Sequence, residues 1–243
     1  MKQICIQSGH WNVTSGQTGA PMEQVRTLAI GLKLVDLLRK QGYIVYHTDS
    51  FANLNKDVTG RDWDLFLSLH CDMDYAGTEG GGFADFPEPS TDQATSESQR
   101  IVKAIESVYF KESGIRNVPS RRNANTKYYY MWSALSAKTP CAILEMGESI
   151  DPHDSVILND TERVAKAILG GINKAFPGAV VPPTPEPPTD PCANLRDDFS
   201  RVSASLLNAE LDRDKALNSQ KTLLTENADL KRKLIDIQKI LNG

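Results

Sequence analysis

The chain has 243 residues and a formal charge of −4, and 40% of its residues are hydrophobic and 24% are charged. The slight acidic excess argues against a protein whose main task is to bind nucleic acid or an anionic membrane surface. No run of about 20 apolar residues occurs, so no transmembrane helix is expected. The composition is that of a globular protein with one or two domains, and neither nucleic acid nor a membrane is an expected partner.

The cysteines and the first residues bear on where the protein is made. The four cysteines lie far apart and form no C-x-x-C pair, which favours reduced thiols over a disulfide scaffold. Only residues 4–6 form an apolar run near the start, so the apolar segment of a signal peptide is missing. Synthesis in a cytoplasm, without a signal peptide, is therefore expected.

Up to residue 176, short apolar runs alternate with segments of helical periodicity. Strands are predicted over 4–6, 43–47, 65–70 and 142–146, with a further one over 80–86. Apolar residues recur at helical spacing over 25–35, 101–108 and 164–172. This alternation predicts an α/β domain over residues 1–176, with a mostly parallel, twisted sheet flanked by helices.

The end of the chain has a different composition. Residues 177–194 contain seven of the thirteen prolines, which predicts a semi-rigid linker. In residues 195–243, mostly apolar residues recur every seven positions from Leu195 to Ile237, with a second series three residues before each from Val202 onward. These heptads predict a coiled-coil helix, weaker in its middle, through which the chain forms a homo-oligomer. The alternative is one amphipathic helix that folds back onto the first domain.

Two of the four histidines come at the ends of predicted strands. His10 follows the strand at 4–6, and His70 closes the strand at 65–70. Because ligands of parallel α/β sheets bind outside the carboxyl ends of the strands, both imidazoles are expected at the functional edge. Two imidazoles at one edge suggest a metal site, and a catalytic zinc typically takes a third protein ligand.

Glu23 is the candidate for that third ligand. It lies thirteen residues after His10, at the start of the first predicted helix, where the chain returns toward the same edge. The alternative is a simple helix-start acid, because the dipole of a helix stabilises a negative charge at its N-terminus by about 0.3 to 1 kcal/mol.

Glu145 stands inside the apolar strand predicted over 142–146. An unpaired carboxylate in such a strand costs several kcal/mol or becomes protonated, so it needs a partner or a catalytic duty. At the carboxyl end of its strand it could take a proton from a zinc-bound water. The alternative is a buried ion pair with an arginine such as Arg61, Arg121 or Arg122.

The remaining candidates are weaker. His47 alternates with apolar residues and is expected to be a hydrogen-bonded histidine at a strand end. His153 is expected in a solvated loop, and its place shortly after Glu145 makes it the reserve metal ligand. Cys71 follows His70 directly, and consecutive strand residues point to opposite faces, so both are not expected to reach one ion.

Together, these segments resemble the zinc-dependent N-acetylmuramoyl-L-alanine amidases of bacterial wall remodelling and phage endolysins, over roughly residues 2–176. Ser8-Gly9-His10 is similar to the Gly-His of the family's first strand, and Glu23 to the glutamate that opens its first long helix. Leu67-Ser68-Leu69-His70 resembles the Ser-x-His ligand, and Leu144-Glu145-Met146-Gly147 the Glu-x-Gly catalytic segment. Arg61 also falls where the family often has an arginine.

The resemblance implies a fold, a cofactor and a reaction. Zinc held by His10, Glu23 and His70 would bind a water and polarise the carbonyl of the lactyl group joined to L-alanine. Glu145 would act as general base toward the water and then as acid toward the alanine nitrogen. The expected substrate is bacterial peptidoglycan.

Three departures from the family pattern stand near these residues. Trp11-Asn12 replaces the usual Gly-Gly, Asp72 replaces the asparagine two positions after the second histidine, and Glu148 replaces a common phenylalanine. The four candidate residues are intact, so the departures concern the substrate groove and the preferred peptidoglycan chemotype.

Two other functions are weighed against the amidase. One is a zinc peptidase that cuts within the stem peptide, and the other is an inactive wall-binding scaffold whose coiled coil does the work. The missing signal peptide favours a phage endolysin that is made in the host cytoplasm and reaches the wall after release.

Overall fold

The computed structural model describes residues 1–11, 19–48, 56–73, 80–87, 95–122, 129, 131–179, 223, 226–227 and 230–233. The chain divides into two units, Met1–Ser200 and Arg201–Gly243. Within the described ranges, none of the helices combines the length and the apolar character needed to cross a membrane. The predicted linker lies almost wholly outside these ranges, and so does most of the predicted coiled coil.

The first unit contains a five-stranded sheet in the order β2-β1-β3-β5-β4. Its strands are β1 (Gln3–Ser8), β2 (Ile44–Thr48), β3 (Leu65–Asp72), β4 (Phe83–Asp85) and β5 (Cys141–Glu148). The first three strands and β5 are parallel, whereas β4 pairs with β5 in the antiparallel sense. The predicted α/β class with a mostly parallel sheet is therefore confirmed, and each predicted strand is present with shifted ends.

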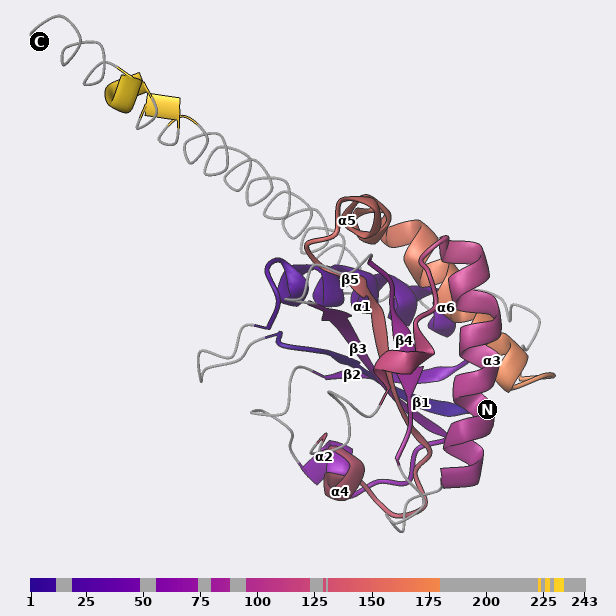
Figure 1. Ribbon diagram of the computed structural model, residues 1–243. Helices are drawn as coiled ribbons and strands as arrows, with labels where there is room; N and C mark the ends of the chain where they lie inside the picture. The colour runs from indigo at the N-terminus through magenta and orange to yellow at the C-terminus, as the bar shows by residue number, and fades with distance from the viewer. Residues whose placement is uncertain are drawn as a thin grey trace, which may run out of the picture. The chain divides into compact units, whose positions relative to one another are not determined.

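Helices cover both faces of this sheet (Figure 1). The long helices α1 (Glu23–Lys40), α3 (Thr95–Ser113) and α6 (Thr161–Ala175) pack on one face, where α6 contacts both α1 and α3. The short helices α2 (Lys56–Thr59) and α4 (Met131–Ala134) lie on the other face. The other helical elements among the described residues of this unit are a 3-10 turn, η2 (Pro119–Arg121), and α5 (Pro152–Asn159).

Alternation along the strands divides the core into two clusters. Leu65, Leu67 and Leu69 belong to the larger cluster beneath the long helices, and Phe66 belongs to a smaller cluster with Trp63 and the α4 side chains. Since side chains alternate along a strand, Ser68 and His70 share the face of Phe66. His70 thus lies on the face of the short helices.

The sequence misplaced some local features. The helical spacing over 25–35 covers only part of a helix that runs from Glu23 to Lys40. His153 belongs to the first turn of α5 rather than to a loop, and Asp151 caps that helix by accepting hydrogen bonds from the backbone N–H groups of His153 and Asp154. Short or polar helices of this kind have little apolar periodicity by which to detect them.

Candidate active site

The sheet reverses its winding at β1, because β2 lies on one side of β1 and β3 on the other. Such a switch point leaves a crevice at the carboxyl ends of the two diverging strands, where α/β proteins bind ligands. His10 follows β1 by two residues, and His70 is the sixth residue of β3. Their rings meet edge to face, with centroids 5.1 Å apart. The structure therefore brings both predicted histidines together at this crevice.

The loops around the crevice hold strained backbone. Within the described residues, His10 (φ 55°) and Met22 (φ 66°) are the two non-glycine residues with positive φ. Gly19 (φ 70°) packs against the His10 ring and the Glu23 carboxylate, so a side chain there would collide with both. Strain of this kind persists where the surrounding structure enforces it, and it clusters at functional sites. Here it falls at or directly before two candidate ligands.

Glu23, the first residue of α1, points toward His10 and His70, and its side chain is 3% exposed. Its Oε1 lies 3.1 Å from His70 Nδ1 and 3.7 Å from His10 Nε2. The backbone N–H groups of Ala20 and Cys71 donate to its two oxygens at 2.8 and 2.9 Å. These bonds fix the orientation of the carboxylate, so Glu23 does more than cap a helix dipole.

Two opposing effects act on the Glu23 carboxyl. Burial raises its pKa, whereas the hydrogen bond and charge of His70, the charge of His10 and the Cys71 N–H lower it. The lowering effects prevail, and the pKa of Glu23 lies below its ordinary value. Glu23 is therefore an ionised carboxylate beside two imidazoles, which is a donor set suited to a divalent cation.

Glu145 lies beside His70 because the two are register partners in the parallel pair of β3 and β5. Its Oε2 is buried without a hydrogen-bond partner among the described residues, and the same holds for His70 Nε2. Burial raises the pKa of the Glu145 carboxyl well above its usual range, and the negative charges of Glu23 and Asp72 raise it further. An unsatisfied buried carboxyl is costly, and a carboxyl with such a raised pKa is a candidate for proton transfer.

None of the three arginines proposed as alternative partners pairs with Glu145. Arg122 pairs with Glu106, and the guanidinium of Arg61 lies 5.9 Å from the ring centroid of Trp63. Arg121 Nη1 lies 3.4 Å from Asp72 Oδ2, and its Nη2 lies 3.8 Å from Glu148 Oε2. The buried ion pair expected as the alternative for Glu145 is therefore wrong within the described part of the chain.

A β-bulge between His70 and Asp72 explains how Glu148 joins this site. The register passes from His70 opposite Glu145 to Asp72 opposite Glu148, so β5 carries one extra residue. The extra residue turns Glu148, instead of Gly147, to the face of Glu145. Two of the departures from the family pattern, Asp72 and Glu148, thus stand opposite each other with Arg121 beside both. No periodicity in the sequence could reveal this bulge.

Tyr129 is a second contributor that sequence reasoning missed. Its ring meets His70 edge to face with centroids 5.8 Å apart. Its hydroxyl donates to Gln7 Oε1 at 2.6 Å and lies 2.7 Å from Ser68 Oγ. These contacts hold the Tyr129 ring against the His70 imidazole. The run of tyrosines at 128–130 was visible in the sequence, but nothing in it indicated which of them reaches the site.

The weaker candidates lie where they were expected or apart from the crevice. His47 is hydrogen bonded to Ser8 at 2.9 Å, and Cys71 is buried in the core on the opposite face from His70. His153 groups with Asp151 and Asp154 instead of with the crevice residues. The carboxylates of that group already accept backbone N–H bonds, including one from Gly81 to Asp154 at 2.5 Å. We therefore assign His153 no place among the crevice ligands.

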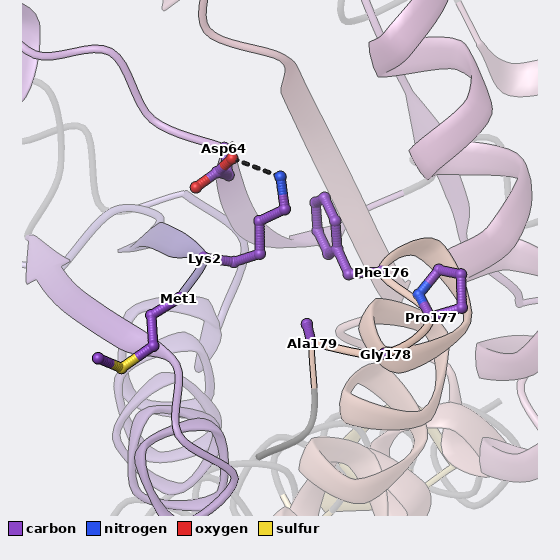
Figure 2. Close-up of a pocket in the computed structure, with 7 residues that line it drawn as sticks. All are labelled: Met1, Lys2, Asp64, Phe176, Pro177, Gly178 and Ala179. Atoms are coloured by element: carbon purple, nitrogen blue, oxygen red, sulfur yellow. Dashed lines mark hydrogen bonds and ion pairs between the residues drawn. The ribbon is translucent and has the colours of Figure 1, made fainter.

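A separate pocket of about 420 Å³ lies at the other end of the sheet, and Figure 2 shows its lining. Lys2 stands across it with Nζ 2.7 Å from Asp64 and 5.4 Å from the ring centroid of Phe176. The residues that line it are Met1, Lys2, Asp64, Phe176, Pro177, Gly178 and Ala179. Its two charged side chains, Lys2 and Asp64, are paired with each other.

Residues 4–174 match the sequence profile of a family described as N-acetylmuramoyl-L-alanine amidase. The chain belongs to this amidase family. The matched range ends within α6 and includes every crevice residue described above. A comparison with curated proteins finds no match for the chain.

Solved amidase structures share the fold of the first unit. The CwlD amidase of Clostridioides difficile, solved with the GerS lipoprotein, has a TM-score of 0.53 at 19% identity, covering 72% of this chain and 98% of that chain. The catalytic domain of CwlV from Bacillus (Paenibacillus) polymyxa has the same score and identity, with coverage of 72% and 97%. An amidase from Mycobacterium smegmatis reaches 0.58 at 15% identity, with coverage of 72% and 96%.

Proposed function

We propose that the chain is a zinc-dependent peptidoglycan hydrolase that cleaves the amide bond between N-acetylmuramic acid and L-alanine. One observation carries this proposal: ligand atoms of His10, Glu23 and His70 lie within 4.8 Å of one another, and neighbouring Glu145 has a buried Oε2 without a hydrogen-bond partner among the described residues. Family membership supplies the reaction class, and the crevice supplies the groups that such a reaction needs.

The residues present fit a catalytic zinc. Two imidazoles and one carboxylate are a common three-ligand set for catalytic zinc, which leaves a position for water or substrate. The short distance from His70 Nδ1 to Glu23 Oε1, together with the nearby His10, describes donors converging on one point. When bound, zinc would supply a Lewis acid that polarises the scissile carbonyl.

Glu145 performs the proton transfers in this proposal. Its ionised carboxylate accepts a proton from water as the water oxygen bonds to the lactyl carbonyl carbon. As the carbon–nitrogen bond breaks, the same carboxyl donates the proton to the departing nitrogen of L-alanine. The products are a lactyl carboxylate on intact glycan and a stem peptide with a free amine. Burial and the nearby charges of Glu23 and Asp72 raise the pKa of Glu145, which makes its carboxylate a stronger base toward the water.

Product analysis separates this function from its rivals. Purified peptidoglycan digested with the full chain should yield intact glycan and stem peptides with a free L-alanine amine, as read by mass spectrometry. A zinc peptidase would instead cut within the stem, and an inactive scaffold would release nothing. Activity that survives Glu145→Ala, or thorough chelation with no metal left in the protein, would contradict the proposed mechanism.

We also propose that residues 195–243 join copies of the chain. The described residues of this unit are helical, and Leu223 and Leu230, one heptad apart, are each 64% exposed. Exposed leucines at heptad spacing favour a coiled-coil partner, and linked catalytic heads would leave an insoluble polymer more slowly than single ones. Sedimentation should show a larger species for the full chain than for a chain that ends at Pro177. The phage endolysin role stays a prediction.

A further inference from the structure

Three hydrogen bonds link β2, β1 and α1 behind the candidate zinc ligands. His47 Nε2, from β2, lies 2.9 Å from Ser8 Oγ, at the end of β1. Ser8 Oγ donates to the backbone oxygen of Thr27 at 2.9 Å, and Thr27 Oγ1 donates to the backbone oxygen of Gly9 at 2.7 Å. The chain of contacts therefore passes from His47 to the turn that carries His10.

The sheet register explains why His47 reaches Ser8. His47 is the register partner of Ile6, so both lie on the face of the long helices, and Ser8 is the next β1 residue on that face. Gly31 of α1 leaves the room for this contact. A side-chain carbon at Gly31 would stand 2.5 Å from Ser8 Oγ and 3.3 Å from His47 Nε2. The polar contact is thus built into the packing of α1 on the sheet.

The direction of the bonds fixes what His47 does. Ser8 has one hydroxyl proton, and it is used on the Thr27 carbonyl. Ser8 must therefore accept from His47, whose Nε2 carries a proton. Ser8 is fully buried and gives its proton to a backbone oxygen, so this serine–histidine pair is not a nucleophile with its base. His47 is a donor that fixes the orientation of Ser8.

These hydrogen bonds hold the backbone of Gly9 and His10, which adjoins both candidate histidine ligands. His10 has a left-handed backbone (φ 55°), and Gly9 packs so closely on the His70 ring that a side-chain carbon there would lie 2.6 Å from Nε2. Thr27 lies one helical turn after Glu23 on α1. The bonds of Ser8 and Thr27 therefore set the distance between the His10 turn and the helix that carries Glu23.

We propose that His47 is a positioning residue for the zinc site, acting through Ser8 and Thr27 on the placement of His10 relative to Glu23. This inference rests on the proposed function, since it assumes that zinc binds these ligands. Groups that orient metal ligands typically contribute about 10- to 100-fold in metal affinity. His47 acts through two further residues, so an effect near the lower end, about tenfold, is expected.

Two isosteric substitutions test the donor role. Glutamine at position 47 places a donor nitrogen four bonds from Cα, as histidine does, whereas glutamate places an acceptor there. The zinc affinity of metal-free full-length protein is measured by competition with a chromophoric chelator. We expect His47→Gln to bind zinc within about twofold of wild type and His47→Glu to bind about tenfold more weakly. An added negative charge would by itself attract zinc, so weaker binding points to lost geometry.

Matched controls use the exposed histidine of α5. His153→Gln and His153→Glu repeat the same exchanges at a side chain that is 70% exposed, and both should leave zinc affinity unchanged. The thermal midpoint of each metal-free variant shows whether it is folded. Ser8→Ala interrupts the same chain of bonds by removing a single oxygen, and it provides the second variant if position 47 does not accept glutamate.

The outcomes separate the two proposals. Equal zinc affinity for folded His47→Glu and His47→Gln, or wild-type affinity for folded Ser8→Ala, would overturn the positioning role while leaving the zinc site in place. Failure of the wild-type chain to bind zinc would overturn the proposed cofactor and the positioning role together. Weaker zinc binding by folded His47→Glu and Ser8→Ala, with His47→Gln close to wild type, would support the positioning role.

Discussion

The two ends of the sheet differ in the burial of their charged side chains. At the amino end, Lys2 and Asp64 pair with each other across an open pocket and remain 44% and 32% exposed (Figure 2). At the carboxyl end, Glu23 and Glu145 are buried, the backbone at His10 is strained, and polar atoms lack partners among the described residues. The pocket at the amino end therefore has the less reactive chemistry of the two ends.

This difference shows what marks the functional end. Exposed ion pairs contribute about 0 to 1 kcal/mol and carry little information about function. Buried carboxylates and strained turns cost free energy, and a fold retains such costs where chemistry needs them. Four predictions, in order of decreasing effect, test whether the two ends differ in this way.

The largest effect should follow Glu145→Gln. Removing the proton-transferring carboxyl should lower amide hydrolysis by about 10²- to 10⁴-fold, while the zinc content stays the same. Turnover of soluble muropeptides and metal analysis of the purified variant provide the two measurements. Glu97→Gln, an exchange at an exposed glutamate of α3, is the matched control and should hydrolyse normally. Hydrolysis by Glu145→Gln at the wild-type rate would remove Glu145 from the mechanism.

Glu23→Gln should weaken zinc binding by more than about 100-fold, because a direct ligand matters more than a group that orients one. Chelator competition measures the affinity, and wild type should bind close to one zinc per chain. The control is Glu162→Gln on α6, whose carboxylate is 47% exposed and pairs with Lys33 and Lys166. Equal losses at Glu23 and Glu162 would mean that the crevice is not the zinc site.

Glu145→Gln should also stabilise the metal-free protein at neutral pH. The pKa of Glu145 in the folded state lies above its ordinary value of 4.5, so its contribution to stability is complete below that pH and is lost as the pH rises through the folded pKa. Glutamine has no such loss, so the variant should gain about 1 kcal/mol, roughly 2–4 °C in Tm. Urea unfolding at about pH 4 and about pH 7 should show the gap only at the higher pH. A gap that does not change with pH would contradict burial of an ionisable carboxyl.

The smallest effect is expected at the amino end. Lys2→Met removes the partner of Asp64 and should change the free energy of unfolding by less than about 1 kcal/mol, because the pair is exposed to solvent. Zinc affinity and hydrolysis should be unchanged. A loss of hydrolysis in folded Lys2→Met protein would show that the two ends of the sheet are coupled. It would contradict the view that only the carboxyl end serves catalysis.

Local patterns were enough to predict the sheet and the candidate residues. Apolar runs bounded by polar residues predicted each strand, and the place of His10 and His70 after or at the end of their strands put both at the carboxyl edge. Glu145 was conspicuous because an acid interrupts an apolar strand. These inferences succeed because strand periodicity and strand ends depend on neighbouring residues. Zinc, the roles of the four residues and the oligomer stay predictions.

Other features depend on contacts that no local pattern encodes. The pairing of Arg121 with Asp72 and Glu148 requires a bulge in the register of β3 and β5. Tyr129 reaches His70 from a segment about 60 residues away. The short helix α5, which holds His153, has too little apolar periodicity to detect. Each of these features is decided by how distant segments pack.

The sequence by itself determined the fold class, the places of the strands along the chain and the types of side chain near their carboxyl ends, because period and polarity act over a few residues. Only the tertiary structure decided that Glu23 turns onto His70 and that Glu145 lies beside it, with no arginine partner in the described ranges. The same holds for the contact of His47 with Ser8. The physical reason is that register, bulges and the return of a loop are set by long-range packing, which selects one arrangement among many that the local pattern allows.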